Sequence, residues 1–211
     1  MIKMVTALFM TILGFSLFGC AGSSSELIQT HVEKDRVGRP VKNALIIVVV
    51  DDQEIRTIFE NHFKDWLNAK GTEAVISVDV LPVEMGAKLE KEAIVAVIDN
   101  HASDAILITH IVGLDQIEVF NRGRPRFYSN YYGFYNYASV YVTWPTVYGE
   151  KVKLRLETRL YDTKTESLIW AGETQLVNPK STGEAIGQVV KGVMTDLEKN
   201  GLLPETPKDK N

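Results

Sequence analysis

The apolar run ALIIVVV, residues 44–50, is the feature that most constrains how this chain can fold. A short β-branched run without polar interruption is typical of a strand that is buried on both faces of a sheet. Asp51 and Asp52 end the run, and Asp51 with Glu54 forms a capping pair that predicts the start of a helix. A buried strand followed directly by a helix predicts a sheet with helices packed on it.

The helix predicted after this capping pair is amphipathic and ends before Gly71. Its inner stripe, at a spacing of about 3.6 residues, consists of Ile55, Ile58, Phe59, His62, Phe63, Trp66 and Leu67. Glu60 then falls on the exposed face of the helix. Beyond Gly71 we predict a strand over residues 73–80, a second helix over residues 89–100 and another buried strand, AILITHIV, over residues 105–112.

Strict alternation of apolar and charged residues predicts an antiparallel strand over residues 151–162, with one face exposed to water. The turn DTKTES joins it to a hairpin partner, LIWAGETQLV, at residues 168–177. Ser181 and Glu184 then form a capping box for a last helix that Gly201 ends. The apolar set of the first strand is Val152, Leu154, Leu156 and Leu160, and its charged set is Lys151, Lys153, Arg155, Glu157 and Arg159.

The predicted element order is βαβαβ, then a β-meander, then α. This order predicts an α+β (α/β-like) fold with a mixed, mostly antiparallel sheet and helices packed on it. We predict a single domain over residues 44–203 and a disordered tail over residues 204–211. A chain of this length buries a sizeable core without disulfide bonds, and Cys20, the only cysteine, has no partner for one within the chain.

The N-terminal residues have the layout of a secretory signal. Lys3 is their only charge, and the apolar run from Met4 to Phe18 is shorter than the about 20 residues that a membrane-spanning helix needs. The run ends in Leu17-Phe18-Gly19-Cys20, which resembles the lipobox of bacterial lipoproteins. The resemblance implies a signal peptide over residues 1–19 and acylation of Cys20 by fatty acids such as palmitate. An ordinary signal peptide with an incidental cysteine is the alternative.

The resemblance also implies an outer-membrane protein that faces the periplasm, because Ala21 rather than an aspartate follows the cysteine. Residues 20–43 contain Ser, Gly and Pro without sustained periodicity, so we predict a flexible tether behind the lipidated cysteine. Such a tether spans roughly 25 Å r.m.s.. Removal of residues 1–19 with Lys3 changes the formal net charge from −4 to −5. Mild acidity argues against a general affinity for nucleic acid.

The element order resembles that of small periplasmic lipoprotein domains of the curli-secretion and penicillin-binding-protein-activator kind. The hairpin YDTKTESLIWAGE, residues 161–173, follows a Tyr/Gly-rich stretch, and the pair is similar to one in uncharacterised outer-membrane lipoproteins. These likenesses cover most of residues 44–203 and bring no catalytic signature with them. They imply a lipid-anchored periplasmic domain. The curli-secretion likeness also implies a structural subunit of a ring-like envelope assembly, so a homo-oligomer stays open.

Seven of the eight tyrosines lie within residues 126–149, RFYSNYYGFYNYASVYVTWPTVYG. From Tyr137 to Trp144 the side chains alternate, which predicts a strand, whereas residues 122–135 fit no period and are predicted as a loop. Aromatic rings and arginines dominate interface hot spots, and guanidinium groups bind carboxylates such as those of cell-wall peptides. The predicted partner-binding residues are Arg122, Arg124, Arg126, Tyr128, Tyr131, Tyr132 and Tyr135. The alternative is that the rings cover the edge of the sheet.

Residues that carry chemistry are few. Three of the four histidines have plainer explanations: His31 lies in the tether, His62 on the inner side of a helix and His110 in a buried strand. His101, with Asp99 and Asp104 in DNHASD, is a weak metal-site candidate without a spacing motif. We therefore predict a non-enzymatic protein without metal or cofactor that binds an envelope protein or peptidoglycan. An envelope hydrolase built on Asp51 or on DNHASD is the remaining alternative.

Overall fold

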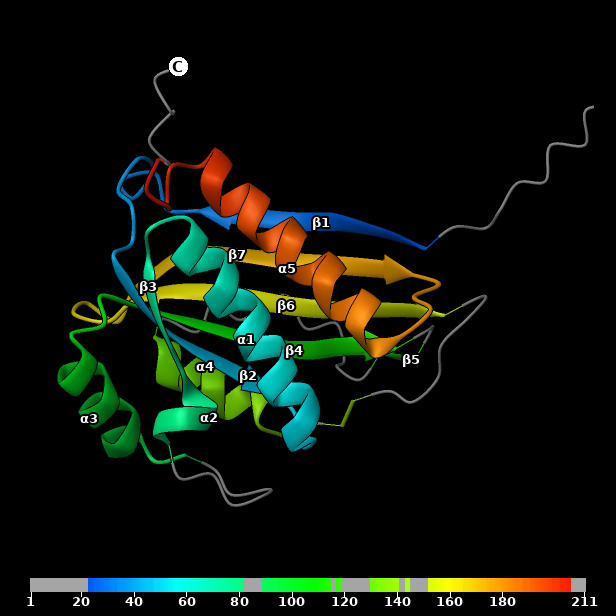
Figure 1. Cartoon of the computed structure of the whole chain (residues 1–211), viewed down its shortest axis with the longest axis horizontal. Helices are drawn as coiled ribbons and strands as arrows, with labels where there is room; N and C mark the ends of the chain where they lie inside the picture. Colours follow the sequence, from blue (N-terminus) through cyan, green and yellow to red (C-terminus); the bar gives the residue numbers. More distant parts are fainter. Residues whose placement is uncertain are drawn as a thin grey trace, which may run out of the picture.

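The computed structural model describes residues 23–81, 89–114, 117–118, 130–140, 143–144 and 152–205. Within these residues the chain forms one sheet with helices on both faces (Figure 1). The strands are β1 (Ser24–Val32), β2 (Asn43–Val49), β3 (Glu73–Ile76), β4 (Ala105–Leu114), β5 (Ile117–Glu118), β6 (Lys153–Asp162) and β7 (Leu168–Val177). The helices are α1 (Gln53–Ala69), α2 (Ser77–Val80), α3 (Lys91–His101), α4 (Tyr131–Ala138) and α5 (Thr182–Lys199).

The strand order of the sheet is β1-β7-β6-β4-β2-β3, and β5 pairs with β4 beside this path. β2 runs parallel to β3 and to β4, because helices carry the chain back between these strands. The pairs β1–β7, β7–β6 and β6–β4 are antiparallel, and a short turn at residues 163–167 joins β6 to β7 as a hairpin. The predicted α+β fold with a mixed, mostly antiparallel sheet is confirmed.

One face of the sheet, called the α1/α5 face below, is covered by the two longest helices, which lie in front of the strands in Figure 1. Asp52 caps α1 by accepting the N–H groups of Glu54 and Ile55, and Ser181 caps α5 by accepting that of Glu184. The core of this face includes Ile46, Val48, Phe59, Phe63, Leu156, Trp170 and Val189.

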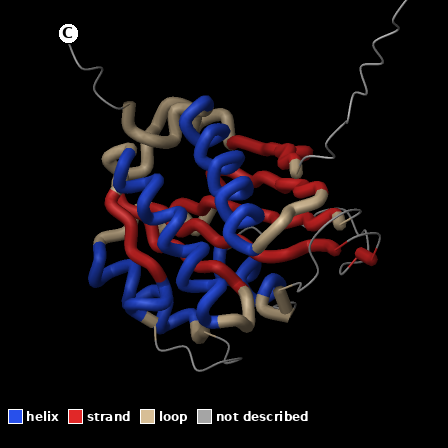
Figure 2. The backbone as a smooth tube through the Cα atoms, turned by 45° about the vertical axis from the view of Figure 1, so that its right-hand side comes forward, coloured by secondary structure: helices blue, strands red, loops and turns tan. Residues whose placement is uncertain are grey.

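The other face, called the α3/α4 face, is covered by α3 and α4 over β2 and β4. Figure 2 shows the same arrangement turned by 45°, with helices and strands in separate colours. The core of this face includes Leu45, Ile47, Ile94, Ile106, Ile108, Tyr131 and Phe134. Alternate residues of β2 therefore belong to two cores, as the run ALIIVVV predicts. No helix in the described part of the chain is both long and apolar enough to cross a membrane.

Residues 24–32 form the edge strand β1, so the prediction of a flexible tether over residues 20–43 is wrong for these positions. The strand pairs with β7 from Ser24 opposite Val177 onward, and only three of its nine residues are partly buried. Its stabilisation comes mainly from backbone hydrogen bonds to β7. An edge strand with so little apolar burial lacks the alternation that identifies strands in a sequence, and a bulge near its middle interrupts the pattern further.

The inner stripe of α1 also differs from the prediction. Glu60 is fully buried and Arg56 is 5% exposed, whereas Ile58 is 37% exposed and His62 is exposed. The reason is a polar contact between α1 and the strand that follows it. Because Glu60 accepts the hydroxyl of Ser77 at 2.5 Å and a further N–H from the next residue, the predicted strand over residues 73–80 ends at Ile76 and turns into α2.

Candidate functional site

Helix α4 lies where the sequence predicted a loop up to residue 135 and a strand from Tyr137. Asn130 starts the helix, because its side-chain oxygen accepts the N–H of Gly133 at 2.8 Å. Tyr131, Phe134, Tyr135 and Ala138 are buried, at the i, i+3, i+4 and i+7 positions of a helix. An asparagine cap followed by this spacing is the sequence signal that indicates the helix. The alternation over Tyr137–Trp144 favoured a strand instead, because a helix of eight residues offers only about two turns of periodicity.

The predicted partner-binding residues divide into two groups. Arg122, Arg124, Arg126 and Tyr128 lie outside the described residues, as does the predicted lipidation site Cys20. Tyr131 and Tyr135 are 1% and 5% exposed, so their rings pack on the sheet and offer no surface to a partner. Of the predicted tyrosines on α4, only Tyr132 is partly exposed.

Two tyrosine hydroxyls of α4 hold the chain that leads into α3. The N–H of Leu89 donates to the hydroxyl of Tyr135 at 2.9 Å, and the hydroxyl of Tyr132 donates to the carbonyl of Leu89 at 3.4 Å. Burial raises the pKa of Tyr135 above its ordinary value, against the smaller lowering effect of that N–H. At Tyr131 and Tyr135 the structure therefore agrees with the alternative interpretation, in which the aromatic rings cover the sheet.

A polar cluster lies beneath α4 on β4 and β6. The guanidinium of Arg159 donates to Glu157 at 2.8 Å from Nε and forms the second contact of the ion pair at 2.7 Å from Nη2. His110 Nε2 lies 3.4 Å from the other carboxylate oxygen of Glu157. His110 pairs directly with Glu157 across the two strands, so the sheet register brings these side chains together. Arg159, predicted to face water, is 3% exposed.

Aromatic rings of α4 enclose this cluster. The guanidinium carbon of Arg159 lies 4.2 Å from the ring centroid of Phe134, a cation–π contact. The ring of His110 meets Phe134 edge-on at 5.1 Å and Tyr137 at 5.7 Å. Desolvation raises the pKa of Glu157, but the hydrogen bond from His110 and the charge of Arg159 outweigh it and hold that pKa below its ordinary value. The carboxylate is thus kept ionised and paired, which suits a structural role better than proton transfer.

The charged row continues along β6 toward the surface. Arg155 Nη1 donates to Glu173 of β7 at 3.0 Å, and these two side chains are 25% and 19% exposed. Glu157 is 17% exposed. The half of the α3/α4 face formed by β6 and β7 is therefore a charged strip beside the aromatic helix, and it can offer carboxylates and guanidinium groups to a polar ligand.

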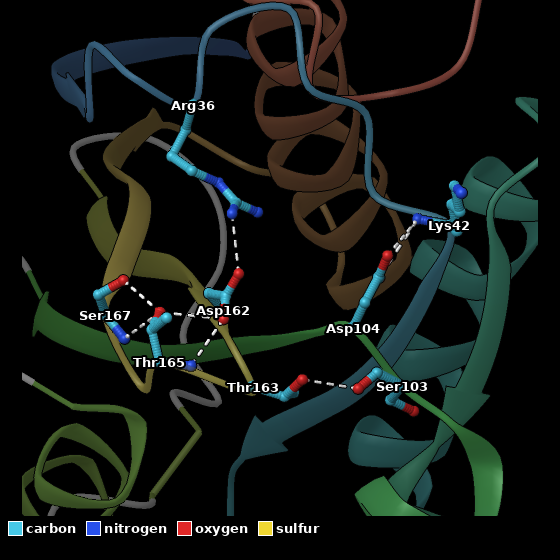
Figure 3. Close-up of polar contacts among 8 residues, drawn as sticks. All are labelled: Arg36, Lys42, Ser103, Asp104, Asp162, Thr163, Thr165 and Ser167. Atoms are coloured by element: carbon cyan, nitrogen blue, oxygen red, sulfur yellow. Dashed lines mark hydrogen bonds and ion pairs between the residues drawn. The ribbon is translucent and has the colours of Figure 1, made fainter.

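Of the candidate metal residues of DNHASD, Asp104 has other contacts for its carboxylate. Asp104 accepts the backbone N–H groups of Lys42 and Asn43 at 3.1 Å, and the hydroxyl of Thr163 donates to the carbonyl of Ser103 at 2.7 Å (Figure 3). In the same close-up, Arg36 donates to Asp162 at 2.8 Å. These contacts join the start of β2 and the β6–β7 turn to the loop before β4. Among the described residues, no three side chains of the metal-binding types come together to hold an ion.

No protein-family model and no curated protein matches the chain. Among solved structures, the PelC dodecamer from Paraburkholderia phytofirmans aligns with 87% of this chain and 100% of its own, at 9% identity and a TM-score of 0.43. A PDZ domain protein from Parabacteroides distasonis ATCC 8503 aligns with 83% of this chain and 36% of its own, at 15% identity and a TM-score of 0.45. Likenesses at this level carry no argument about the function of this chain.

Proposed function

We propose that this protein is a lipid-anchored periplasmic protein that binds another envelope component, a protein or the cell wall, without a reaction of its own. The anchor is the acyl group on Cys20, and the contact residues are Arg122, Arg124, Arg126 and Tyr128, called the arginine segment below. Three guanidinium groups within five residues suit a partner that carries carboxylates. Peptidoglycan peptides and acidic protein surfaces both have this chemistry.

The observation that carries the proposal is how the chain is held on either side of the arginine segment. Before it, β5 pairs with β4 through Gly113 opposite Glu118. After it, Asn130 caps α4 and Tyr131 is buried against the sheet. A connection between two points fixed on one sheet loses less conformational entropy on binding than a free tail does. The buried tyrosines thus support the contact residues rather than forming the contact themselves.

The test is photo-crosslinking in cells from position 128, compared between the wild-type segment and a variant with Arg122→Ala, Arg124→Ala and Arg126→Ala. We expect a discrete adduct that the triple variant weakens at least tenfold. The matched control is Lys34→Ala, Arg39→Ala and Lys164→Ala, which removes the same charge from exposed positions elsewhere. His62, an exposed residue of α1, is the control crosslinking position. Equal adducts in all variants would refute the assignment.

A second candidate function, a structural subunit of an envelope assembly, is favoured by the position of β1. This strand is the last in the sheet order, and in the described part of the chain its outer edge has no strand beside it. Such an edge is a template for pairing with another copy, although the bulge in β1 shortens the regular stretch. Light scattering on the chain without its anchor tests this, because a monomer at all concentrations would exclude it.

A further inference from the structure

One end of the sheet gathers the start of the described chain and the start of α5. Ser24 of β1, Val177 of β7 and Lys153 of β6 lie in register at this end. The end of β7 leads through Lys180 into α5, which starts at Thr182. The opposite end carries the turn at residues 163–167 (Figure 1). We call the first the β1-start end and the second the turn end.

The chain is fixed to the β1-start end from Ser23 onward. The hydroxyl of Ser23 donates to the carboxylate of Glu184, and Gln188 Nε2 donates to the Ser23 oxygen at 2.9 Å. Glu184 also accepts the backbone N–H of Lys180 at 2.8 Å. Side chains of α5 therefore hold the residue that precedes β1. What remains between the domain and Cys20 is much shorter than the predicted tether.

Covalent geometry sets the length of this remaining link. Two residues, Ala21 and Gly22, lie between Cys20 and Ser23. The link is therefore three residue steps long, and a fully extended chain covers at most about 3.6 Å per step, or about 11 Å. The predicted tether of residues 20–43 would have spanned roughly 25 Å r.m.s.. A membrane that holds Cys20 thus lies within about 11 Å of Ser23. The domain has no freedom to stand away from it.

The surface at the β1-start end is polar and carries accessible amines. Lys153 and Lys180 are exposed, as are Ser24, Ser25 and Ser181. Among the described residues of β1, β6, β7 and α5 at this end, the acidic groups are Glu184, which is held by Ser23 and Lys180, and the exposed Glu26. Asp51, Asp52 and Glu54, which are exposed, follow the end of β2 further across the sheet. Ammonium groups among serines suit phosphate-bearing headgroups and not the hydrocarbon layer. Such a surface rests on a bilayer without entering it.

Building on the proposed lipid anchor, we infer that the β1-start end is a membrane-contact surface, and that its partner is the headgroup layer around Cys20. The turn end then faces the aqueous periplasm. β6 has ten residues, and strands rise about 3.3 Å per residue, so the turn end stands about 30 Å further along the strand direction.

The test is amine footprinting of the full chain in isolated outer membranes, with mass spectrometry of each lysine before and after detergent solubilisation. We expect acylation of Lys153 and Lys180 to rise at least threefold on solubilisation. Lys34 and Lys164, which are exposed at the turn end, should not change. Equal changes at the two ends, or protection of Lys34 and Lys164 alone, would overturn the inference.

A variant with a longer linker tests whether the short link to Cys20 causes the protection of Lys153 and Lys180. Twenty Gly/Ser residues inserted between Ala21 and Gly22 should raise the labelling of Lys153 and Lys180 in membranes toward the detergent value. The same insertion in the turn at residues 163–167 should leave their protection in place. Incorporation of labelled palmitate is measured in parallel and reports on the anchor alone. Palmitate incorporation without protection of Lys153 and Lys180 would refute the proposed orientation. Protection of these lysines without palmitate incorporation would refute the acyl anchor. Loss of both would refute the anchor and the orientation together.

Discussion

The strands of the sheet bury their side chains for different reasons on its two faces. On the α1/α5 face, apolar residues of the strands meet apolar stripes of two long helices, and Thr109 and Thr158 satisfy each other at 2.9 Å. On the α3/α4 face, β2 is equally apolar, but β4 and β6 bring His110 and a Glu157–Arg159 pair under α4.

The difference shows what a strand pattern can and cannot predict. An apolar residue is buried by its own hydrophobic effect, so the α1/α5 face follows from the alternation along β6. A charged residue is buried only if a partner and a cover are supplied elsewhere in the chain. Arg159 has both, in Glu157 and in the ring of Phe134 at 4.2 Å. Glu157 lies on β6 itself, but the pattern along β6 contains no sign of the ring that covers the pair.

The largest expected effect is on the α1/α5 face. Phe59→Ala should lower the free energy of unfolding by about 3–5 kcal/mol, because it removes a fully buried ring that stacks on Phe63 at 5.4 Å. Urea denaturation followed by circular dichroism measures the loss. Ile58→Ala on the same helix is the control, since this side chain is 37% exposed. Equal losses for the two variants would contradict the observed stripe of α1.

Next comes the buried carboxylate of α1. Glu60→Ala should cost about 3 kcal/mol, because it leaves Arg56 without its counter-charge and the N–H groups of Val48 and Val78 without their acceptor. Asp65→Ala, an exposed acidic position of α1, should cost far less. Thermal denaturation of both variants measures the two losses of stability. A cost below that of Asp65→Ala would show that the cluster is not closed in solution.

The same carboxylate has a definite pH signature. Desolvation raises the pKa of Glu60 above 4.5, against the lowering effect of Arg56 and its hydrogen-bond donors. The titration of Glu60 therefore makes the free energy of unfolding decline as the pH rises from 4.5 through the raised folded-state value. Glu60→Gln should remove that decline.

On the α3/α4 face the pH signature has the opposite sign. The folded-state pKa of Glu157 lies below 4.5, so its ion pairs stabilise the fold above pH 4.5 and are lost as the pH falls through the folded-state value. Glu157→Gln should cost about 1.5–3 kcal/mol at neutral pH, the range for hydrogen bonds to charged groups, and progressively less in acid. Urea titrations at several pH values measure this. A cost that stays constant into acid would mean that the cluster is not ionised.

The smallest expected effect is on α4, the helix that covers the Glu157–Arg159 pair. Asn130→Ala should cost about 1 kcal/mol, because it removes the side-chain cap of α4. Hydrogen exchange should quicken in residues 131–138 and in the amides of β6 below them, while α5 stays protected. Ser181→Ala, which removes the cap of α5, should show the reverse pattern. Unchanged exchange in residues 131–138 would indicate that burial of Tyr131 alone holds the helix.

Much of the fold was predictable from local pattern. The buried strand β2, the hairpin of β6 and β7 and the cap of α5 at Ser181 each combine a period with a turn or cap signal, and all three occur in the structure. The predicted capping box is only half formed, because Glu184 accepts the N–H of Lys180 and not that of Ser181. The candidate site was less predictable. Its helix is short, and two of its tyrosines were assigned to a contact surface although they lie in the core.

The sequence by itself determined the two-faced core and the mixed character of the sheet, because hydrophobic burial and helix capping act over a few neighbouring residues. Only the tertiary structure decided the edge strand at residues 24–32, the burial of Glu60 and Arg159 and the inward turn of Tyr131. Each of these depends on a partner more than ten residues away: β7 for the edge, Ser77 for Glu60, Phe134 for Arg159 and the sheet for Tyr131. Such partners meet only after the chain has folded, so no local period can report them.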